Sequence, residues 1–120
     1  MIKGIGIDLL ETSRIKKALE RPGFIEKYYS AKEIELASNG KWKKLANNYA
    51  AKEAVSKAFG LGFHKFYLRD IEILRDLLGK PYVRLHGNAK KIAGRMRIKN
   101  IYVSISDTSE HIMAVAIMER

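Results

Sequence analysis

Residues 49–60 read Tyr49-Ala50-Ala51-Lys52-Glu53-Ala54-Val55-Ser56-Lys57-Ala58-Phe59-Gly60. We interpret this stretch as the last three turns of the longest helix, which the sequence predicts for residues 42–59. Apolar side chains recur upstream at the i, i+3, i+4, i+7 spacing of a buried helical face, at Trp42, Leu45, Ala46 and Tyr49. At 100° per residue, Glu53 lies about 20° around the helix axis from Trp42 and therefore shares this face.

A carboxylate on a largely apolar helix face needs a cation. Lys57 lies four residues after Glu53, and a surface ion pair in this order stabilises a helix by roughly 0.2–0.5 kcal/mol. The alternative is that Glu53 ligates a hard metal ion while Lys57 reaches an anionic substrate. The helix by itself leaves both interpretations open.

Size and composition predict one globular domain spanning residues 1–120, because 120 residues with 47% hydrophobic content can bury one core. The sequence has neither an apolar run of the roughly 20 residues that span a membrane nor a secretion signal. We therefore expect a cytoplasmic protein with no membrane partner. The absence of cysteine excludes disulfides, thiolate zinc sites and a cysteine nucleophile. Any metal must be held by oxygen or imidazole.

The formal net charge is +10, from 23 basic and 13 acidic residues, and such a charge attracts polyanions. Nucleic acid, an acidic protein and a phosphorylated cofactor all qualify as partners. A small nucleic-acid-binding domain is supported by charge alone, because the chain shows no aromatic-rich strand motif of the RRM kind and no convincing helix-turn-helix. We therefore expect no nucleic-acid partner.

Alternation along residues 2–10 predicts a strand with two distinct faces. The apolar side chains at positions 5, 7 and 9 point one way, and Gly4, Gly6 and Asp8 point the other. Glycine in a strand often marks the close approach of a ligand or of another backbone. The two glycines would leave open space against the Asp8 carboxylate for a ligand, but a simple bulge or tight packing explains them as well, and by themselves they favour the packing interpretation.

The remaining pattern predicts an α+β fold with a largely antiparallel sheet packed on the long helix, because helices and strands are segregated along the chain. Short helices are expected from a cap at Thr12 or Ser13 to Leu19, from a Ser30–Glu33 capping box to Asn39-Gly40, and from a cap at Asn88 to Met96. Strands are expected over 66–74, exposed on one side, and in partners at 82–86, 101–106 and 112–118.

Two carboxylates remain as candidates for chemistry, Asp8 and Glu53, on different elements. The sequence contains no Walker loop, dinucleotide fingerprint, His-Glu-x-x-His motif or nucleophile elbow. Two or three oxygen ligands, with waters and substrate phosphates, are typical of magnesium sites. Lys57 could then hold a phosphate. Their spacing does not establish that Asp8 and Glu53 meet in space.

At these residues the chain resembles the holo-acyl-carrier-protein synthases, the short bacterial class of 4′-phosphopantetheinyl transferase. Three blocks match in the family's order: Gly4-Ile5-Gly6-Ile7-Asp8 with Glu11 and Arg14-Ile15, then Ala50 to Gly60, then Val103-Ser104-Ile105-Ser106-x-Thr108. Asp70-Ile71-Glu72-Ile73 and Gly79-Lys80-Pro81 also correspond. The resemblance covers nearly the whole chain.

The resemblance implies transfer of the phosphopantetheine arm of coenzyme A to a serine of an acidic apo acyl carrier protein, with release of adenosine 3′,5′-bisphosphate. It implies that Mg²⁺ binds Asp8 and Glu53, that Lys57 contacts the phosphates, and that a metal-bound water or Glu53 takes the serine proton. It also implies a homotrimer with coenzyme A between subunits. The residues it assigns to the coenzyme A site are Ser56, Lys57, Gly60, Pro81 and Thr108, and it assigns Arg14 to carrier binding.

Two residues depart from the family's usual pattern. Asp107 stands where relatives usually carry histidine, and Asn48 stands where many carry arginine. Each change removes a cation expected near the phosphates, and Asp107 adds an anion. A homologue that keeps the trimer and binds the carrier or coenzyme A, with weak or no transfer, is therefore an alternative.

Overall fold

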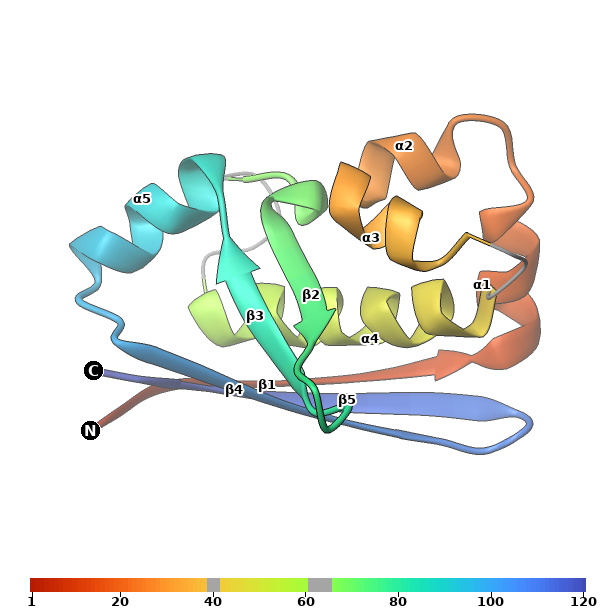
Figure 1. The fold of residues 1–120 in the computed structure, drawn as a ribbon. Coiled ribbons are helices and arrows are strands. Elements are labelled where there is room, and N and C mark those ends of the chain that lie inside the picture. The colour runs from red at the N-terminus through yellow and green to blue at the C-terminus, as the bar shows by residue number, and fades with distance from the viewer. Residues whose placement is uncertain (39–41, 61–65) are drawn as a thin grey trace.

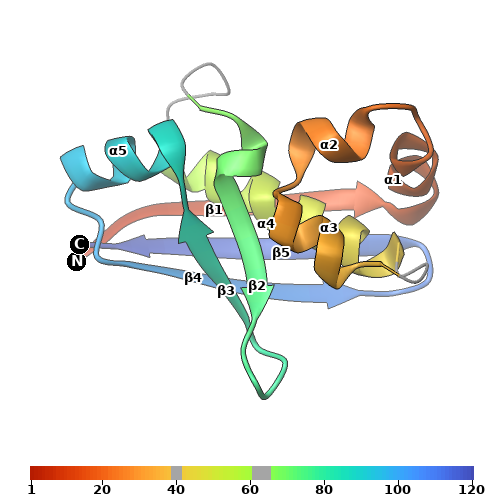
Figure 2. The same cartoon turned by 45° about the horizontal axis from the view of Figure 1, so that its top comes forward.

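The computed structural model describes residues 1–38, 42–60 and 66–120. The elements in chain order are β1 (Ile2–Glu11), α1 (Thr12–Leu19), α2 (Phe24–Tyr28), α3 (Ala31–Leu36), α4 (Trp42–Phe59), the 3₁₀ helix η1 (Leu68–Asp70), β2 (Ile71–Arg75), β3 (Pro81–Leu85), α5 (Gly87–Arg95), β4 (Asn100–Asp107) and β5 (His111–Glu119). Figures 1 and 2 show α4 between the sheet that contains β1 and a second layer formed by α2, α3 and the β2–β3 hairpin.

The strands form two antiparallel sheets, one of three strands in the order β1-β5-β4 and one of two strands, β2-β3. In the first sheet Gly6 lies opposite Ala116 on β5, and Ala116 lies opposite Val103 on β4. Both predicted hairpins are present. The α+β prediction with largely antiparallel pairing is confirmed.

The helix α4 packs on the face of the sheet that carries the small residues. A Cβ atom placed on Gly6 would lie 1.9 Å from the Ala54 carbonyl oxygen, and one on Gly4 would lie 2.0 Å from the Ala58 carbonyl oxygen. The neighbouring strand presents Ala116, which is fully buried. The alternative of tight packing therefore holds at both glycines, because the backbone of α4 fills the space where their side chains would stand.

The opposite face of the sheet is apolar and exposed. Ile5, Ile7 and Leu9 on β1 are 64%, 56% and 65% exposed, and Tyr102 and Met113 on the same sheet are 50% and 42% exposed. The predicted division of β1 into two faces is confirmed. Its glycine face packs on the core, and its apolar face is uncovered in the single chain.

The prediction that the strand within 66–74 is exposed on one side is wrong. Residues Ile71–Leu74 are all buried. Glu72, which was expected to face solvent, accepts a hydrogen bond from Ser30 Oγ at 2.6 Å and lies 3.1 Å from His86 Nε2. These partners come from the start of α3 and the end of β3, so the polar side of β2 is covered by other elements.

The cap expected for α1 at Thr12 or Ser13 is wrong. The N-cap residue is Glu11, which makes no side-chain cap, because β1 runs directly into α1. The Thr12 amide instead donates to the Glu110 carbonyl at 2.8 Å. The turn between β4 and β5 therefore satisfies the first amide of this helix.

The other short helices agree with the sequence in part. The capping box of Ser30 and Glu33 is formed, but α3 ends at Leu36, and the predicted stop at Asn39-Gly40 lies outside the described residues. The N-cap of α5 is His86 and not Asn88. The helix α2 and the 3₁₀ helix η1 were not predicted.

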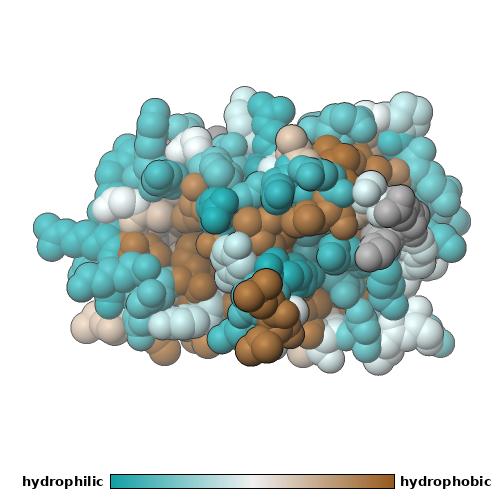
Figure 3. Space-filling view, viewed as in Figure 1, coloured by the Kyte–Doolittle hydropathy of each residue, from teal (hydrophilic) through white to brown (hydrophobic). Residues whose placement is uncertain are grey.

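Apolar side chains also project from the tip of the β2–β3 hairpin, where Leu77 and Leu78 are almost wholly exposed. In Figure 3 an apolar cluster lies low at the centre, where Figure 1 places this tip. Within the described residues, no helix has the length and apolar character needed to cross a membrane.

We expect Gly6→Ala to destabilise the fold by about 2–4 kcal/mol, because the added methyl group would collide with the backbone of α4 and force the helix away from the sheet. Urea unfolding monitored by circular dichroism measures this change. Gly94→Ala is the matched control, since Gly94 is exposed in α5 and a Cβ there meets nothing within 4 Å. This control should stabilise the chain by about 0.5–1 kcal/mol, and equal effects of the two variants would contradict the packing argument.

Candidate active site

The contact between α4 and β1 brings the two predicted carboxylates together. Asp8 is 8% exposed on the glycine face of β1. Lys57, near the end of α4, places Nζ 3.0 Å from Asp8 Oδ1 and 3.1 Å from the Ile7 carbonyl oxygen. Lys57 therefore pairs with Asp8 across the interface, and of the two interpretations left open by the sequence, the ion pair between Lys57 and Glu53 within one helix is not formed.

Glu53 is partly buried one turn before Lys57. Burial raises the pKa of Glu53, and the negative charge of Asp8 raises it further, while a hydrogen bond from Tyr49 and the charge of Lys57 lower it. The net direction is upward. Two carboxylates in a partly buried site repel each other, and either a proton on one of them or a cation between them relieves this repulsion.

The donor set fits a magnesium ion that is held mainly by substrate and water. Asp8 Oδ2 is buried and has no hydrogen-bond partner in the described part of the chain, so one carboxylate oxygen is available to a ligand. Among residues 1–38, 42–60 and 66–120, no group of three or more histidine or acidic side chains gathers around one point. Asp8 and Glu53 would therefore supply two ligands, as is usual for magnesium bound beside phosphates.

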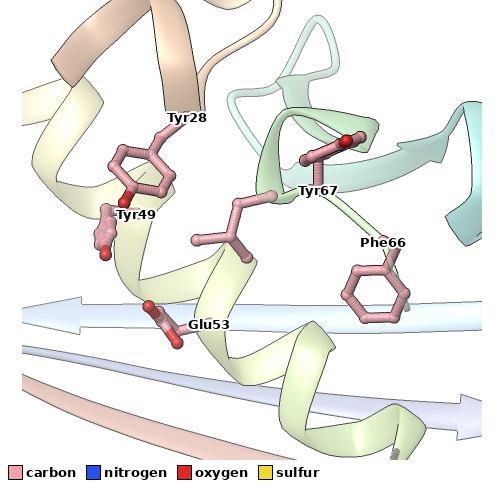
Figure 4. Close-up of a pocket in the computed structure, with 6 residues that line it drawn as sticks. Tyr28, Tyr49, Glu53, Phe66 and Tyr67 are labelled. Atoms are coloured by element: carbon pink, nitrogen blue, oxygen red, sulfur yellow. The ribbon is translucent and has the colours of Figure 1, made fainter. Parts of the chain in front are cut away.

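A pocket of about 360 Å³ opens beside Glu53. Figure 4 shows Tyr49 and Glu53 on α4 with Tyr28 beside Tyr49 at the left, and Phe66 and Tyr67 at the right. The complete lining is Tyr28, Tyr49, Glu53, Phe66, Tyr67 and Leu68. An aromatic pocket with one carboxylate at its edge can hold an uncharged chain beside a reacting centre.

A second groove of about 320 Å³ lies on the other side of Tyr49. Its lining includes Arg14 from α1, Arg21 from the segment that follows α1, and Phe24 from α2. The ring of Tyr49 packs against Phe24 with centroids 5.7 Å apart. Tyr49 thus borders both cavities, and the basic groove of α1 meets the Glu53 pocket at this side chain.

A fully buried ion pair lies behind the site. Lys52 Nζ is 2.6 Å from Glu33 Oε1, and both side chains are 0% exposed. Burial lowers the pKa of Lys52 and raises that of Glu33, and each charge opposes the shift of the other. Asn48 is also buried here and donates to Glu33 Oε2 and to the Ile73 carbonyl oxygen, each at 3.2 Å. Position 48 therefore faces the core in this chain and does not reach the Asp8–Glu53 pair.

Asp107 is hydrogen-bonded to a side chain of α4. Its Oδ2 accepts a hydrogen bond from Asn47 Nδ2 at 2.9 Å, so an amide at the start of α4 holds the carboxylate. The neighbouring Thr108 Oγ1 accepts hydrogen bonds from the amides of Glu110 and His111 at 3.2 and 3.1 Å. Thr108 therefore shapes the β4–β5 turn.

The other residues assigned to the coenzyme A site do not gather around Glu53 within one chain. Ser56 is 2% exposed with a buried hydroxyl, so direct contact with a ligand is not available to it in this conformation. Gly60 is exposed directly after α4, with a φ of 73°, and the neighbouring Leu61 and Gly62 lie outside the described residues. Pro81 begins β3, in the smaller sheet.

Sequence reasoning missed the far wall of the pocket, Phe66 to Leu68, and the buried partner of Lys52. The aromatic wall has no periodic signal, because it precedes a single 3₁₀ turn. Lys52 did carry a signal, since it stands among alanines at 50, 51 and 54 and Val55, where a charged side chain requires a buried partner.

We expect Glu53→Gln to unfold less readily than the native chain at pH 7, by about 0.5–2 kcal/mol. A carboxyl group with a raised pKa in the folded state favours folding only while it is protonated. Its contribution to stability is therefore full below the pKa of the unfolded chain and is lost as pH rises through the pKa of the folded chain. The difference should therefore vanish below about pH 4. Urea titrations at both pH values measure it.

Added Mg²⁺ should stabilise the native chain at pH 7 and leave Glu53→Gln unchanged. The matched control is Glu35→Gln, because Glu35 is exposed on α3; this variant should have the native stability at pH 7 and respond to Mg²⁺ as the native chain does. Equal stabilisation of the native chain and Glu53→Gln by Mg²⁺ would rule out Glu53 as a ligand.

Known proteins share both the sequence and the fold. A sequence model of the 4′-phosphopantetheinyl transferase superfamily matches residues 4–116. The holo-acyl-carrier-protein synthase of Lachnoclostridium phytofermentans is 46% identical over 119 residues, which cover 99% of this chain and 97% of that protein. The holo-ACP synthase structure from Plasmodium yoelii has a TM-score of 0.85 at 42% identity, covering 98% of this chain and 94% of that one.

The Helicobacter pylori holo-acyl-carrier-protein synthase, solved in complex with coenzyme A, has a TM-score of 0.84 at 30% identity and covers 96% of this chain and 99% of that one. Sequence identity and fold agree over nearly the full length in each comparison. The chain therefore belongs to the 4′-phosphopantetheinyl transferase superfamily, in its holo-acyl-carrier-protein synthase class.

Proposed function

We propose that the Asp8–Glu53–Lys57 site transfers the 4′-phosphopantetheine arm of coenzyme A to a serine hydroxyl of an apo acyl carrier protein. The observation that carries the proposal is the pairing of two carboxylates and a lysine across the α4–β1 contact. The family of this chain performs this class of reaction, and the Helicobacter pylori relative binds coenzyme A. Charge alone supports the nucleic-acid alternative.

In the reaction, a bond forms between the serine oxygen and the β-phosphorus of coenzyme A, and the bond from that phosphorus to the bridging oxygen breaks. Adenosine 3′,5′-bisphosphate leaves, and the serine proton needs an acceptor. Glu53 borders the pocket and can accept this proton, either directly or through a water that a bound metal would hold. Lys57 is partly exposed at the same place and can pair with the phosphate charge.

Magnesium is the metal that this donor set suits, with Asp8 and Glu53 as its protein ligands. When bound, it would neutralise charge on the pyrophosphate as the phosphoryl bond breaks. Asp8 contributes the buried oxygen without a partner. Lys57 now bonds Asp8 Oδ1, and it can turn to a phosphate once a cation balances that carboxylate.

The basic groove of α1 is the proposed docking surface for the carrier. Arg14 and Arg21 line it, and Tyr49 connects it to the Glu53 pocket. With a net charge of +10, the chain should attract an acidic carrier protein over a distance and hold it by charge complementarity. A carrier bound there would present its serine next to Glu53.

We also propose a homotrimer with coenzyme A between subunits. Two features support it: the apolar outer face of the sheet is uncovered, and Gly60, Pro81 and Thr108 do not meet Glu53 within one chain. Pairing of subunits through that face would bury Ile5, Ile7 and Leu9 and could bring these residues to a neighbour's site. Light scattering measures the oligomeric state, and a monomer at micromolar concentration would contradict the trimer.

The cytoplasm is the proposed location, in keeping with the absence of cysteine.

Transfer is tested by the intact mass of an apo acyl carrier protein after incubation with this chain, coenzyme A and Mg²⁺. We expect a mass gain of one phosphopantetheine group, abolished by a chelator. Glu53→Ala and Asp8→Ala should each slow the gain on the order of 100-fold or more, because each removes charge stabilisation of the transition state. Glu35→Ala is the matched control and should transfer normally.

Absence of a mass gain with several carriers, from a folded chain that binds coenzyme A, would favour the homologue without efficient transfer. Full activity of Glu53→Ala or Asp8→Ala would instead refute the metal-ligand assignment. The two outcomes are separate, because the first concerns the native chain and the second concerns only the variants.

We expect Arg14→Ala to raise KM for the carrier about 5–10-fold with little change in KM for coenzyme A, since the lost charge lies in the docking groove. The effect should shrink as salt is raised from 50 to about 500 mM, where surface charges are screened. Lys91→Ala, an exposed position on α5, is the control. A carrier KM that is unchanged in Arg14→Ala would contradict the docking surface.

A further inference from the structure

The buried Lys52 connects the active-site helix to the far wall of the pocket. Its ammonium group uses three acceptors, with Nζ 3.0 Å from the Leu68 carbonyl oxygen, 2.5 Å from the Ile71 carbonyl oxygen and 2.6 Å from Glu33 Oε1. The ammonium also lies 5.4 Å from the centre of the Tyr29 ring. All three donors are therefore satisfied inside the core.

One of these acceptors belongs to the pocket beside Glu53. Leu68 lines that pocket and begins η1, and the turn of η1 is closed by a 3.0 Å hydrogen bond from the Asp70 amide to the Tyr67 carbonyl oxygen. Phe66, another lining residue on the same wall, packs on Phe59 of α4 with ring centroids 5.0 Å apart. The far wall is thus attached to α4 at two points, one apolar and one charged.

A fold-stabilising role does not account for a lysine at this position. A fully buried ion pair stabilises a protein little compared with apolar side chains of the same volume, and its replacement is often neutral. What an apolar side chain cannot do is donate a hydrogen bond to the Leu68 carbonyl. Because Lys52 directly precedes Glu53, that hydrogen bond links the pocket wall to the residue beside the reacting carboxylate.

We propose that Lys52 is a positioning residue of the transfer reaction, which sets the width of the pocket by holding Leu68 at a fixed distance from Glu53. Glu33 completes the arrangement by accepting from Lys52, from the Ser30 amide and from Asn48. The proposal rests on the proposed function in one respect, namely that the pocket beside Glu53 holds part of coenzyme A.

The test compares Glu33→Gln with the double variant Lys52→Met/Glu33→Gln. Glu33→Gln removes the ion pair and keeps the hydrogen bond from Lys52 to Leu68. The double variant leaves no buried charge and lacks that hydrogen bond. The first readout is hydrogen exchange of the Asp70 amide in the free chain, with the Ala116 amide in the central strand β5 as an internal reference for global opening.

We expect the Asp70 amide to exchange at least tenfold faster in the double variant than in Glu33→Gln, with Ala116 unchanged between them. The second readout is steady-state transfer, in which KM for coenzyme A should rise about tenfold, the factor for one hydrogen bond of typical net strength, while kcat changes less than threefold. Lys52→Gln, whose shorter side chain keeps a donor for Glu33, should resemble the double variant in both readouts.

Equal Asp70 exchange and equal KM in Glu33→Gln and the double variant would overturn the proposal. Failure of both Lys52 variants to fold by circular dichroism, with Glu33→Gln folded, would also overturn it by making Lys52 a requirement of the fold itself. Failure of the proposed function is distinguishable, because the native chain would then show no transfer while the hydrogen-exchange comparison still reports on Lys52.

Discussion

The close approach of the α4 backbone to β1 at Gly4 and Gly6 is the constraint on which the site depends. Carbonyl oxygens of α4 occupy the space that a side chain at either glycine would need. Because α4 lies so close to β1, the negative charge of Asp8 raises the pKa of Glu53. Lys57, one turn further along the helix, donates a hydrogen bond to Asp8. The charged cluster is thus a consequence of backbone packing, and its members are placed by two rigid elements and not by loops.

Two consecutive residues of α4, Lys52 and Glu53, point to different surroundings. Glu53 faces the pocket, and Lys52 faces the core, where Glu33 and two backbone carbonyl groups satisfy it. The polar groups behind the helix extend through the Ser30 capping box to Glu72 and His86. This arrangement ties α3, β2 and β3 to the helix that carries Glu53.

Local patterns predicted the long helix, both hairpins, the Ser30 capping box and the two faces of β1, because those features depend on residues that are near in sequence. The meeting of Asp8 with Glu53 was a hypothesis that spacing alone could not test, since it depends on packing between distant elements. The same reason explains the errors. Alternation in β2 predicted an exposed Glu72, but the groups that cover it come from Ser30 and His86. The glycines of β1 were compatible with a ligand or a backbone, and only the packed structure shows that a helix fills the space.

Diffraction from crystals grown with coenzyme A and Mn²⁺ would show whether Asp8 and Glu53 bind one divalent ion together. Mn²⁺ takes the same oxygen ligands as Mg²⁺ and is located by its anomalous signal. We expect one strong peak about 2.1–2.2 Å from an oxygen of Asp8 and an oxygen of Glu53, in contact with a phosphate oxygen of coenzyme A. A bound coenzyme A whose Mn²⁺ touches neither carboxylate would rule out the shared metal site.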